Sequence, residues 1–300
     1  MEGTKKAPVI TQSMALPSGA GVEMLTAIDA STIVTSDGKD ALAVWRRPAG
    51  MTGEPGRGFA LAKPLKYDAA YGAANSGMAF AVAGGRYLVT GHENGFVLLW
   101  LAGKSGQVDF AKAIDVHPPN PPSNPWGIKN VRGLAEWHNK ILITGSEDGD
   151  LVGLEMPNGK EVFRTRYNKD AERGINAISV VGDWLLVANC SVGPADQNLW
   201  LFSLTSGQPV LSDSANLAID TFRSQTFDFD ADLFASSSGP LFFSSTEEGL
   251  IWMGRIDAGE LIVTGITKSS PEGGSVMDIS PNGDFIASAT YALRIYKLPK

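Results

Sequence analysis

One segment type recurs six times along the 300-residue chain and limits how it can fold. Each copy holds a short apolar strand, a tight turn, a second apolar strand ending in small residues, another turn and a third strand. The first two strands read AIDASTIVTS, AVAGGRYLVTG, LAEWHNKILITG, ISVVGDWLLVAN, DADLFASSSGPLFFSS and DISPNGDFIASA, and the third strands read ALAVWRR, FVLLWLAG, DLVGLEM, NLWLFSL, LIWMGRI and ALRIYKL. Successive third strands lie about 43 to 55 residues apart, which is typical of a four-stranded propeller blade with some enlarged loops.

The composition of these segments favours strands throughout. β-branched and aromatic residues fill them, and Gly, Asn, Asp and Ser bound them. No stretch keeps a 3.6-residue period, so an α-rich fold is not expected. Hydrophobic residues make up 43 % of the chain, enough for a large core, and the 34 glycines suit many tight turns. The sequence therefore predicts an all-β chain that forms a single β-propeller domain over residues 1–300.

The count of repeats predicts six blades, with seven as the alternative. The expected blades cover about 21–67, 77–116, 130–167, 174–213, 225–268 and 274–300. No residues remain after the sixth repeat for a fourth strand, whereas the N-terminal run APVITQSMAL at 7–16 has no other place. We therefore expect 7–16 to complete the last blade, because such closure removes an exposed sheet edge. A seventh blade would have to lie in 1–20 or 211–226, and both are short.

The repeats resemble those of the WD40 family, and three segments illustrate the likeness. They are ITGSEDGDLVGLEM at 143–156, VTGHENGFVLLW at 89–100 and VMDISPNGDFIASATYALRIYKL at 276–298. The resemblance covers nearly the whole chain and implies a propeller that binds other macromolecules. The Trp-Asp dipeptide and the Gly-His pair of the outer connection are both missing. We therefore expect a divergent member whose blades cohere by apolar packing and backbone ladders, without the Asp–His–Ser hydrogen-bond network of regular WD40 blades.

Charge and cysteine content narrow the class of partner and compartment. The net charge is −7 and the pI is about 5.1, which disfavours nucleic acid as the main ligand. The single cysteine, Cys190, provides neither an internal disulfide nor a paired-cysteine metal site, and it reads as a buried structural thiol.

The start of the chain lacks the apolar core of a signal peptide. The longest apolar run, 96–102, is too short to span a bilayer. An intracellular protein, cytoplasmic or nuclear, is expected.

The WD40 resemblance implies that binding residues lie on the loops of one face. The longest of these loops, 117–130, holds five prolines and ends near Trp126. Proline stiffens a loop, so Trp126 either anchors a partner or folds back to plug the channel. Arginines and aromatic residues are common interface anchors, and several lie on neighbouring loops. The candidate ring around the channel mouth consists of Tyr71, Trp126, Lys129, Arg132, Arg173 and Arg223, with Phe222 and Lys169 beside them.

The turns between second and third strands are acidic. They carry Glu93, Glu147, Asp148, Glu247 and Glu248. Acidic residues before glycine are ordinary turn chemistry, which is the favoured interpretation. The alternative is a weak cation site or a contact for a basic partner.

An enzyme is the less favoured alternative. Some six-bladed propellers are metal-dependent hydrolases, and the residues near first-strand starts that offer oxygen ligands are Glu23, Asn130, Asn176 and Asp228. The three histidines, His92, His117 and His138, fall in different loop types, so a zinc site is not expected. No common catalytic motif occurs. The sequence therefore predicts a non-catalytic scaffold that docks a protein or peptide, without a cofactor or metal. The alternative is a hydrolase, or a small-molecule or metal binder, with its site at the channel mouth.

Overall fold

The fold is that of a computed structural model of the chain. The structure describes residues 22–39, 41–47, 58–103, 107–117, 129–168, 174–189, 197–217, 228–246, 249–268, 276–280, 283–289 and 293–297. Within these residues the chain forms β-strands, and the one helical element is a 3-10 turn, η1 (Ala69–Tyr71). The predicted all-β class is confirmed.

The strands form six antiparallel sheets in chain order, each a simple meander. The first three sheets comprise β1 (Met24–Asp29), β2 (Thr32–Ser36), β3 (Ala41–Arg46) and β4 (Ala60–Lys66); β5 (Ala74–Val82), β6 (Gly85–His92), β7 (Phe96–Ala102) and β8 (Val108–Asp115); and β9 (Val131–Trp137), β10 (Ile141–Ser146), β11 (Asp150–Glu155) and β12 (Lys160–Arg166).

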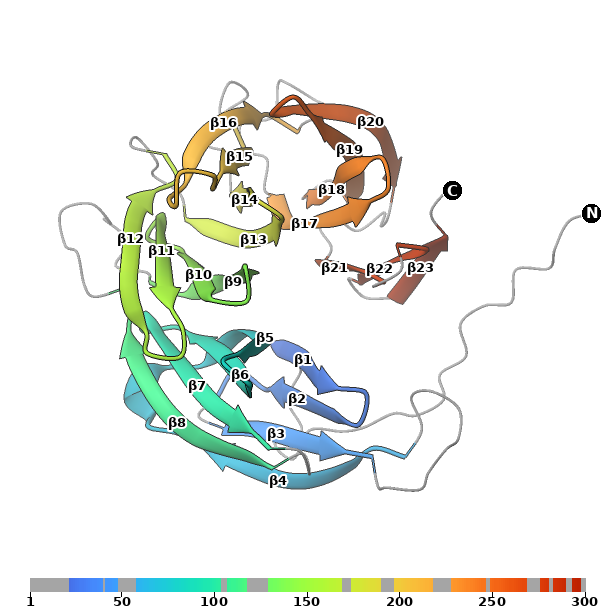
Figure 1. Ribbon diagram of the computed structural model, residues 1–300. Coiled ribbons are helices and arrows are strands. Elements are labelled where there is room, and N and C mark those ends of the chain that lie inside the picture. Colours follow the sequence, from blue (N-terminus) through green and yellow to red (C-terminus); the bar gives the residue numbers. More distant parts are fainter. Residues whose placement is uncertain are drawn as a thin grey trace, which may run out of the picture.

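The remaining sheets comprise β13 (Ile175–Val181), β14 (Trp184–Asn189), β15 (Leu199–Ser203) and β16 (Val210–Ala215); β17 (Asp228–Ser236), β18 (Gly239–Thr246), β19 (Leu250–Asp257) and β20 (Glu260–Lys268); and β21 (Val276–Ile279), β22 (Phe285–Ala289) and β23 (Leu293–Lys297). The first strand of each sheet lies innermost around a common axis, and β4, β8, β12, β16 and β20 lie at the periphery (Figure 1). This arrangement confirms the predicted six-bladed propeller.

The sixth sheet differs from the other five. It has three described strands in the order β21-β22-β23, whereas each of the others has four. The strand expected to complete it, 7–16, lies outside the described residues.

The hydrophobic core lies between neighbouring sheets. Every adjacent pair from the first sheet to the sixth shares one apolar cluster, such as Val34, Leu42 and Leu88 between the first and second sheets. Within a sheet, alternate side chains point to opposite faces, so each blade contributes to the clusters on both of its sides. The ring therefore behaves as one packed body whose sheets hold the channel-facing strands in place.

Indole–hydroxyl hydrogen bonds link the second and third strands of two sheets. Trp45 donates from Nε1 to Thr35 Oγ1 at 2.9 Å, and Trp100 donates to Thr90 Oγ1 at 3.1 Å. A buried indole N–H needs such an acceptor. In the fourth sheet Trp200 donates to the Asn189 amide oxygen at 2.8 Å. These bonds recur at nearly the same spacing along the chain, so polar contacts supplement the expected apolar packing.

Candidate functional site

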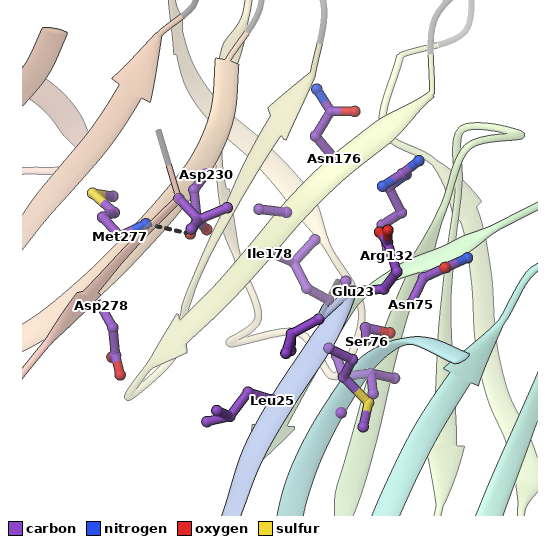
Figure 2. A pocket seen from close by; sticks show the side chains of 17 residues that line it. Glu23, Leu25, Asn75, Ser76, Arg132, Asn176, Ile178, Asp230, Met277 and Asp278 are labelled. Atoms are coloured by element: carbon purple, nitrogen blue, oxygen red, sulfur yellow. Dashed lines mark hydrogen bonds between the residues drawn. The ribbon is translucent and has the colours of Figure 1, made fainter. Parts of the chain in front are cut away.

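The central channel opens into a cavity of about 570 Å³. The first strands of all six sheets line it, with Glu23, Asn75, Arg132, Asn176, Asp230 and Asp278 among the polar residues (Figure 2). These residues lie at the starts of the inner strands, where the connections between blades arrive. The cavity is therefore the channel mouth on the face predicted to carry binding loops.

Three residues of the predicted ring lie along the rim of this mouth. Tyr71 accepts a backbone hydrogen bond from Asn94 at 3.1 Å, and Lys129 Nζ lies 3.5 Å from the carbonyl oxygen of Asn94. Arg132 is exposed, lines the cavity and pairs with Glu147 on the β10–β11 turn. The structure thus brings Tyr71, Lys129 and Arg132 to one face. Tyr71 packs its ring against Phe96 at 4.9 Å, so part of it belongs to the core.

The other predicted rim residues lie outside the described residues: Trp126, Lys169, Arg173, Phe222 and Arg223, together with Cys190, Glu247 and Glu248. The described acidic turn residues have internal roles. Glu93 accepts from the Ala73 N–H at 3.1 Å, and Glu147 accepts from Asn130 at 3.2 Å. Both contacts tie a turn to the start of an inner strand, which is the structural role that turn chemistry predicts.

The suggested oxygen ligands of a metal-dependent hydrolase separate into different environments. Glu23 and Asn176 line the cavity. Asn130 accepts a hydrogen bond from the Asn75 amide at 3.1 Å and donates to Glu147, so its amide belongs to the rim. The side chain of Asp228 lies outside the described residues.

One wall of the cavity carries the carboxyl groups of Asp230 on β17 and Asp278 on β21. Asp230 accepts a hydrogen bond from the Met277 N–H at 3.0 Å, and Asp232 accepts one from the Ser179 hydroxyl at 2.7 Å. Among the described residues no ion pair reaches Asp230, Asp232 or Asp278. Burial is the main reason that the pKa of Asp230 is raised to about 7; the charges of Asp232 and Asp278 act in the same direction, and the hydrogen bond from the Met277 N–H opposes them. Burial likewise raises the pKa of Asp232.

Apolar side chains are exposed beside this wall. Val22 and Leu25 on the first blade are 54 % and 61 % exposed, and Val276 on β21 is 60 % exposed. All three line the cavity. Leu25 and Asp278 lie on the first and last blades of the ring and reach the same region of the mouth (Figure 2). The acidic wall therefore adjoins an apolar one.

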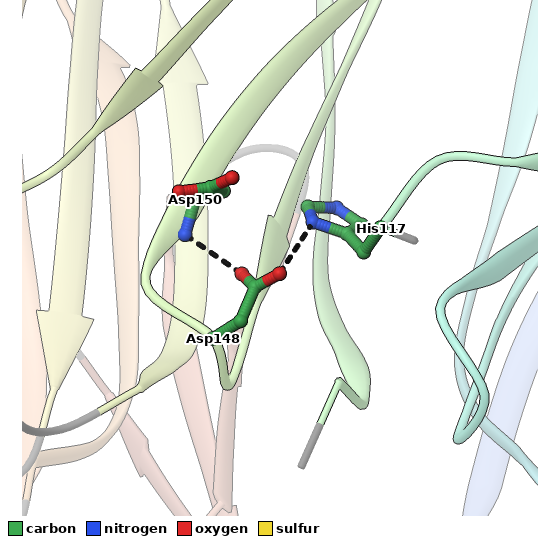
Figure 3. A group of neighbouring side chains, drawn as sticks. All are labelled: His117, Asp148 and Asp150. Carbon is green, nitrogen blue, oxygen red and sulfur yellow. Dashed lines mark hydrogen bonds and ion pairs between the residues drawn. The ribbon is translucent and has the colours of Figure 1, made fainter. Parts of the chain in front are cut away.

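A second group of potential metal ligands lies away from the channel mouth. One ligand atom each of His117, Asp148 and Asp150 falls within 4.8 Å of the others (Figure 3). His117 is fully buried, with Nε2 3.0 Å from Thr144 Oγ1 and Nδ1 3.3 Å from Asp148 Oδ2. Asp150 lies 3.4 Å from the Arg164 guanidinium. His117 Nε2 and the carboxylates of Asp148 and Asp150 are thus already engaged within the protein, which indicates a structural cluster.

This cluster corrects the expectation that an Asp–His–hydroxyl network is missing. The histidine comes from the connection before the third sheet, the threonine from β10 and the aspartate from the β10–β11 turn. The prediction was wrong for this sheet, because His117 lies between the hydroxyl of Thr144, here a threonine and not a serine, and the carboxylate of Asp148. Burial raises the pKa of Asp148, but the hydrogen bond and charge of His117 outweigh it and leave the pKa below its usual value. Burial, followed by the charge of Asp148, raises the pKa of Asp150.

The remaining histidines lie in separate environments, as expected. His92 is buried between the Thr90 hydroxyl at 2.8 Å and the Gly72 carbonyl oxygen at 3.0 Å, and burial lowers its pKa. His138 is exposed and lies 3.1 Å from Asp183. The three imidazoles therefore do not converge on one site.

Comparison with known proteins adds no family assignment. No protein-family profile matches the chain, and no curated protein matches it. Among the described residues no helix is long and apolar enough to cross a membrane. The structure is a six-bladed β-propeller whose channel mouth carries carboxyl groups on one wall and exposed apolar side chains beside them.

Proposed function

We propose that this propeller is a non-catalytic scaffold that docks a protein or peptide partner on the face around its channel mouth. The observation that carries the proposal is the cavity of about 570 Å³, which all six blades line and which opens between the rim residues. Loops held by a rigid sheet scaffold are common places for binding residues. The WD40 resemblance of the repeats points the same way by analogy of fold.

The chemistry of the rim suits a polypeptide. The side chain of Arg132 is 45 % exposed, and Lys129 lies three residues before it in the sequence. Arginine is enriched in protein interfaces, and exposed apolar groups such as Leu25 give a partner surface to bury. The mouth thus offers charged, amide and apolar contacts within one cavity.

Capture of partners from a cell extract by the full chain tests the docking face. We expect a Lys129→Ala, Arg132→Ala double variant to retain its fold and to lose partners that the wild type captures, by about tenfold or more in recovered amount. The matched control is Lys160→Ala, Arg255→Ala, which removes one exposed lysine and one ion-paired arginine from strands away from the mouth.

The control variant should capture the same partners as the wild type. Identical partner sets for all three proteins would remove this rim as the docking face. Circular dichroism and thermal unfolding of each variant establish that any loss does not come from misfolding.

A small-molecule or metal site in the same cavity is the second candidate. Its volume lies within the range of about 300 to 1,000 Å³ found for ligand pockets, which is the observation that favours it. Elemental analysis of the purified protein and a thermal-shift screen with Ca²⁺, Mg²⁺, Mn²⁺ and Zn²⁺ test this candidate. A bound metal at one equivalent per chain, or a saturable shift with one cation, would favour it over docking alone.

A further inference from the structure

The channel mouth is chemically divided. Asp230 and Asp278 lie on one side of the cavity, and Asn75, Ser76 and Arg132 lie on the other (Figure 2). The single cationic group among the lining residues, Arg132, is already paired with Glu147 outside the cavity. Positive charge from within the described part of the chain therefore does not reach the acidic wall.

The apolar neighbours of the acidic wall restrict the kind of cation that fits. Val276 precedes Asp278 by two residues on β21, and alternate residues of a strand point the same way, so both side chains face the cavity. Leu25 and Val22 reach the cavity from the first blade. A hydrated inorganic ion gains nothing from such apolar groups, whereas lysine and arginine bury an aliphatic stem and keep a charged end among polar groups.

We propose that the channel mouth accepts a lysine or arginine side chain of the docking partner. The aliphatic stem lies against Val22, Leu25 and Val276. The charged end lies between the carboxylates of Asp230 and Asp278, where it relieves their mutual repulsion. This inference rests on the proposed docking function and names the chemistry that the partner must present.

Polar side chains across the cavity complete the recognition of a polypeptide. Asn75 and Ser76 lie near the start of β5, on the side away from the carboxylates. Ser76 donates its hydroxyl hydrogen to the Val131 carbonyl oxygen at 2.6 Å, which fixes this rim, and Asn75 is held by Asn130. The backbone of an inserted segment therefore meets a preorganised polar edge while its basic side chain reaches the acidic wall.

The test uses single blocked amino acids as probes on the full chain. Nα-acetyl-lysine N-methylamide and the arginine analogue are titrated, and ¹³C-methyl NMR follows the signals of Val22, Leu25 and Val276. We expect saturable shifts at these methyl groups with dissociation constants on the order of 1 mM. Blocked norleucine, which keeps the stem without the charge, should bind at least tenfold more weakly, and blocked glutamate should cause no saturable shift.

Variants locate the charged contact. Asp230→Asn, Asp278→Asn should weaken the lysine probe at least tenfold, whereas Asp109→Asn, Asp257→Asn, which changes two carboxylates far from the mouth, should bind as the wild type does. Equal shifts with lysine and norleucine, or a double variant that binds lysine unchanged, would overturn the proposal.

The two proposals fail in different ways. If the wild type captures a partner and the Asp230→Asn, Asp278→Asn variant captures it equally, docking stands and the basic side chain is excluded. If the lysine probe binds at the mouth but the rim variants lose no partner, the cation site stands and docking on this face is excluded.

Discussion

Asp230 is a channel residue whose ionisation lowers the free energy of unfolding. Its pKa is raised to about 7 in the folded chain from the ordinary aspartate value of 3.8. The folded state therefore binds a proton more tightly than the unfolded chain does. The stabilising contribution of the protonated group is fully present below about pH 3.8 and is lost as the pH rises toward 7. At higher pH the fold holds a partly buried carboxylate that nothing among the described residues neutralises.

Asp230→Asn should therefore stabilise the protein at pH 8 and leave its stability nearly unchanged at pH 4. An asparagine oxygen still accepts the Met277 N–H and carries no charge. After allowance for screening through the open mouth, we expect a gain of about 1 to 2 kcal/mol at pH 8. Urea unfolding at both pH values measures it, with Asp257→Asn as the exposed control. A variant less stable than the wild type at pH 8 would contradict this account of Asp230.

Asp230 was not singled out from the sequence as a residue of the channel. Asp230 lies inside a strand pattern, DFDADLFAS, whose alternation of acidic and apolar residues is ordinary for a half-exposed strand. Its environment depends on Met277 and Asp278, which lie 47 and 48 residues later in the chain. Packing of the fifth sheet against the sixth places these residues together.

At the scale of the element, most blades could be predicted because each is built from consecutive strands. The alternation of apolar residues and the turn glycines are local signals, so the sheets emerged from the repeat alone. The polar links inside the blades were also present in the sequence: Thr35 and Thr90 each lie ten residues before the tryptophan that donates to them. The second blade begins at Ala74 instead of 77, because a bulge after Ala74 lets the strand continue to pair with His92.

The third sheet offers a test of one such link. His117→Ala removes the imidazole that contacts Thr144 and Asp148, which leaves the buried hydroxyl only its 3.4 Å bond to the Val152 carbonyl oxygen and leaves the nearly buried carboxylate the Asp150 N–H at 2.8 Å. We expect a loss of about 2 to 4 kcal/mol in the free energy of unfolding. His138→Ala, at an exposed site on the same sheet, should change it by less than about 0.5 kcal/mol. Chemical denaturation measures both, and equal stabilities would show that the cluster adds nothing.

At the scale of the whole molecule, the sequence predicted where the channel mouth lies. It did not predict which side chains come together there. The starts of inner strands were expected to face the channel, and Glu23 and Asn176 do line it. Their combination into an acidic wall and an amide edge depends on which blade follows which around the ring. That arrangement requires the number of blades and their placement around the channel, which are properties of the complete fold.

Closure of the ring gives the last prediction. The sixth sheet has three described strands, and β23 is its outermost one, with Ile295 47 % exposed. If residues 7–16 add the fourth strand, their deletion leaves an unpaired edge that invites association between chains. We expect the deletion to lower the melting temperature by about 5 to 10 °C and to produce oligomers in size-exclusion chromatography. Deletion of residues 1–6 is the control and should do neither, because it spares the strand. An unchanged melting temperature after removal of 7–16 would contradict the prediction that this segment completes the sixth sheet.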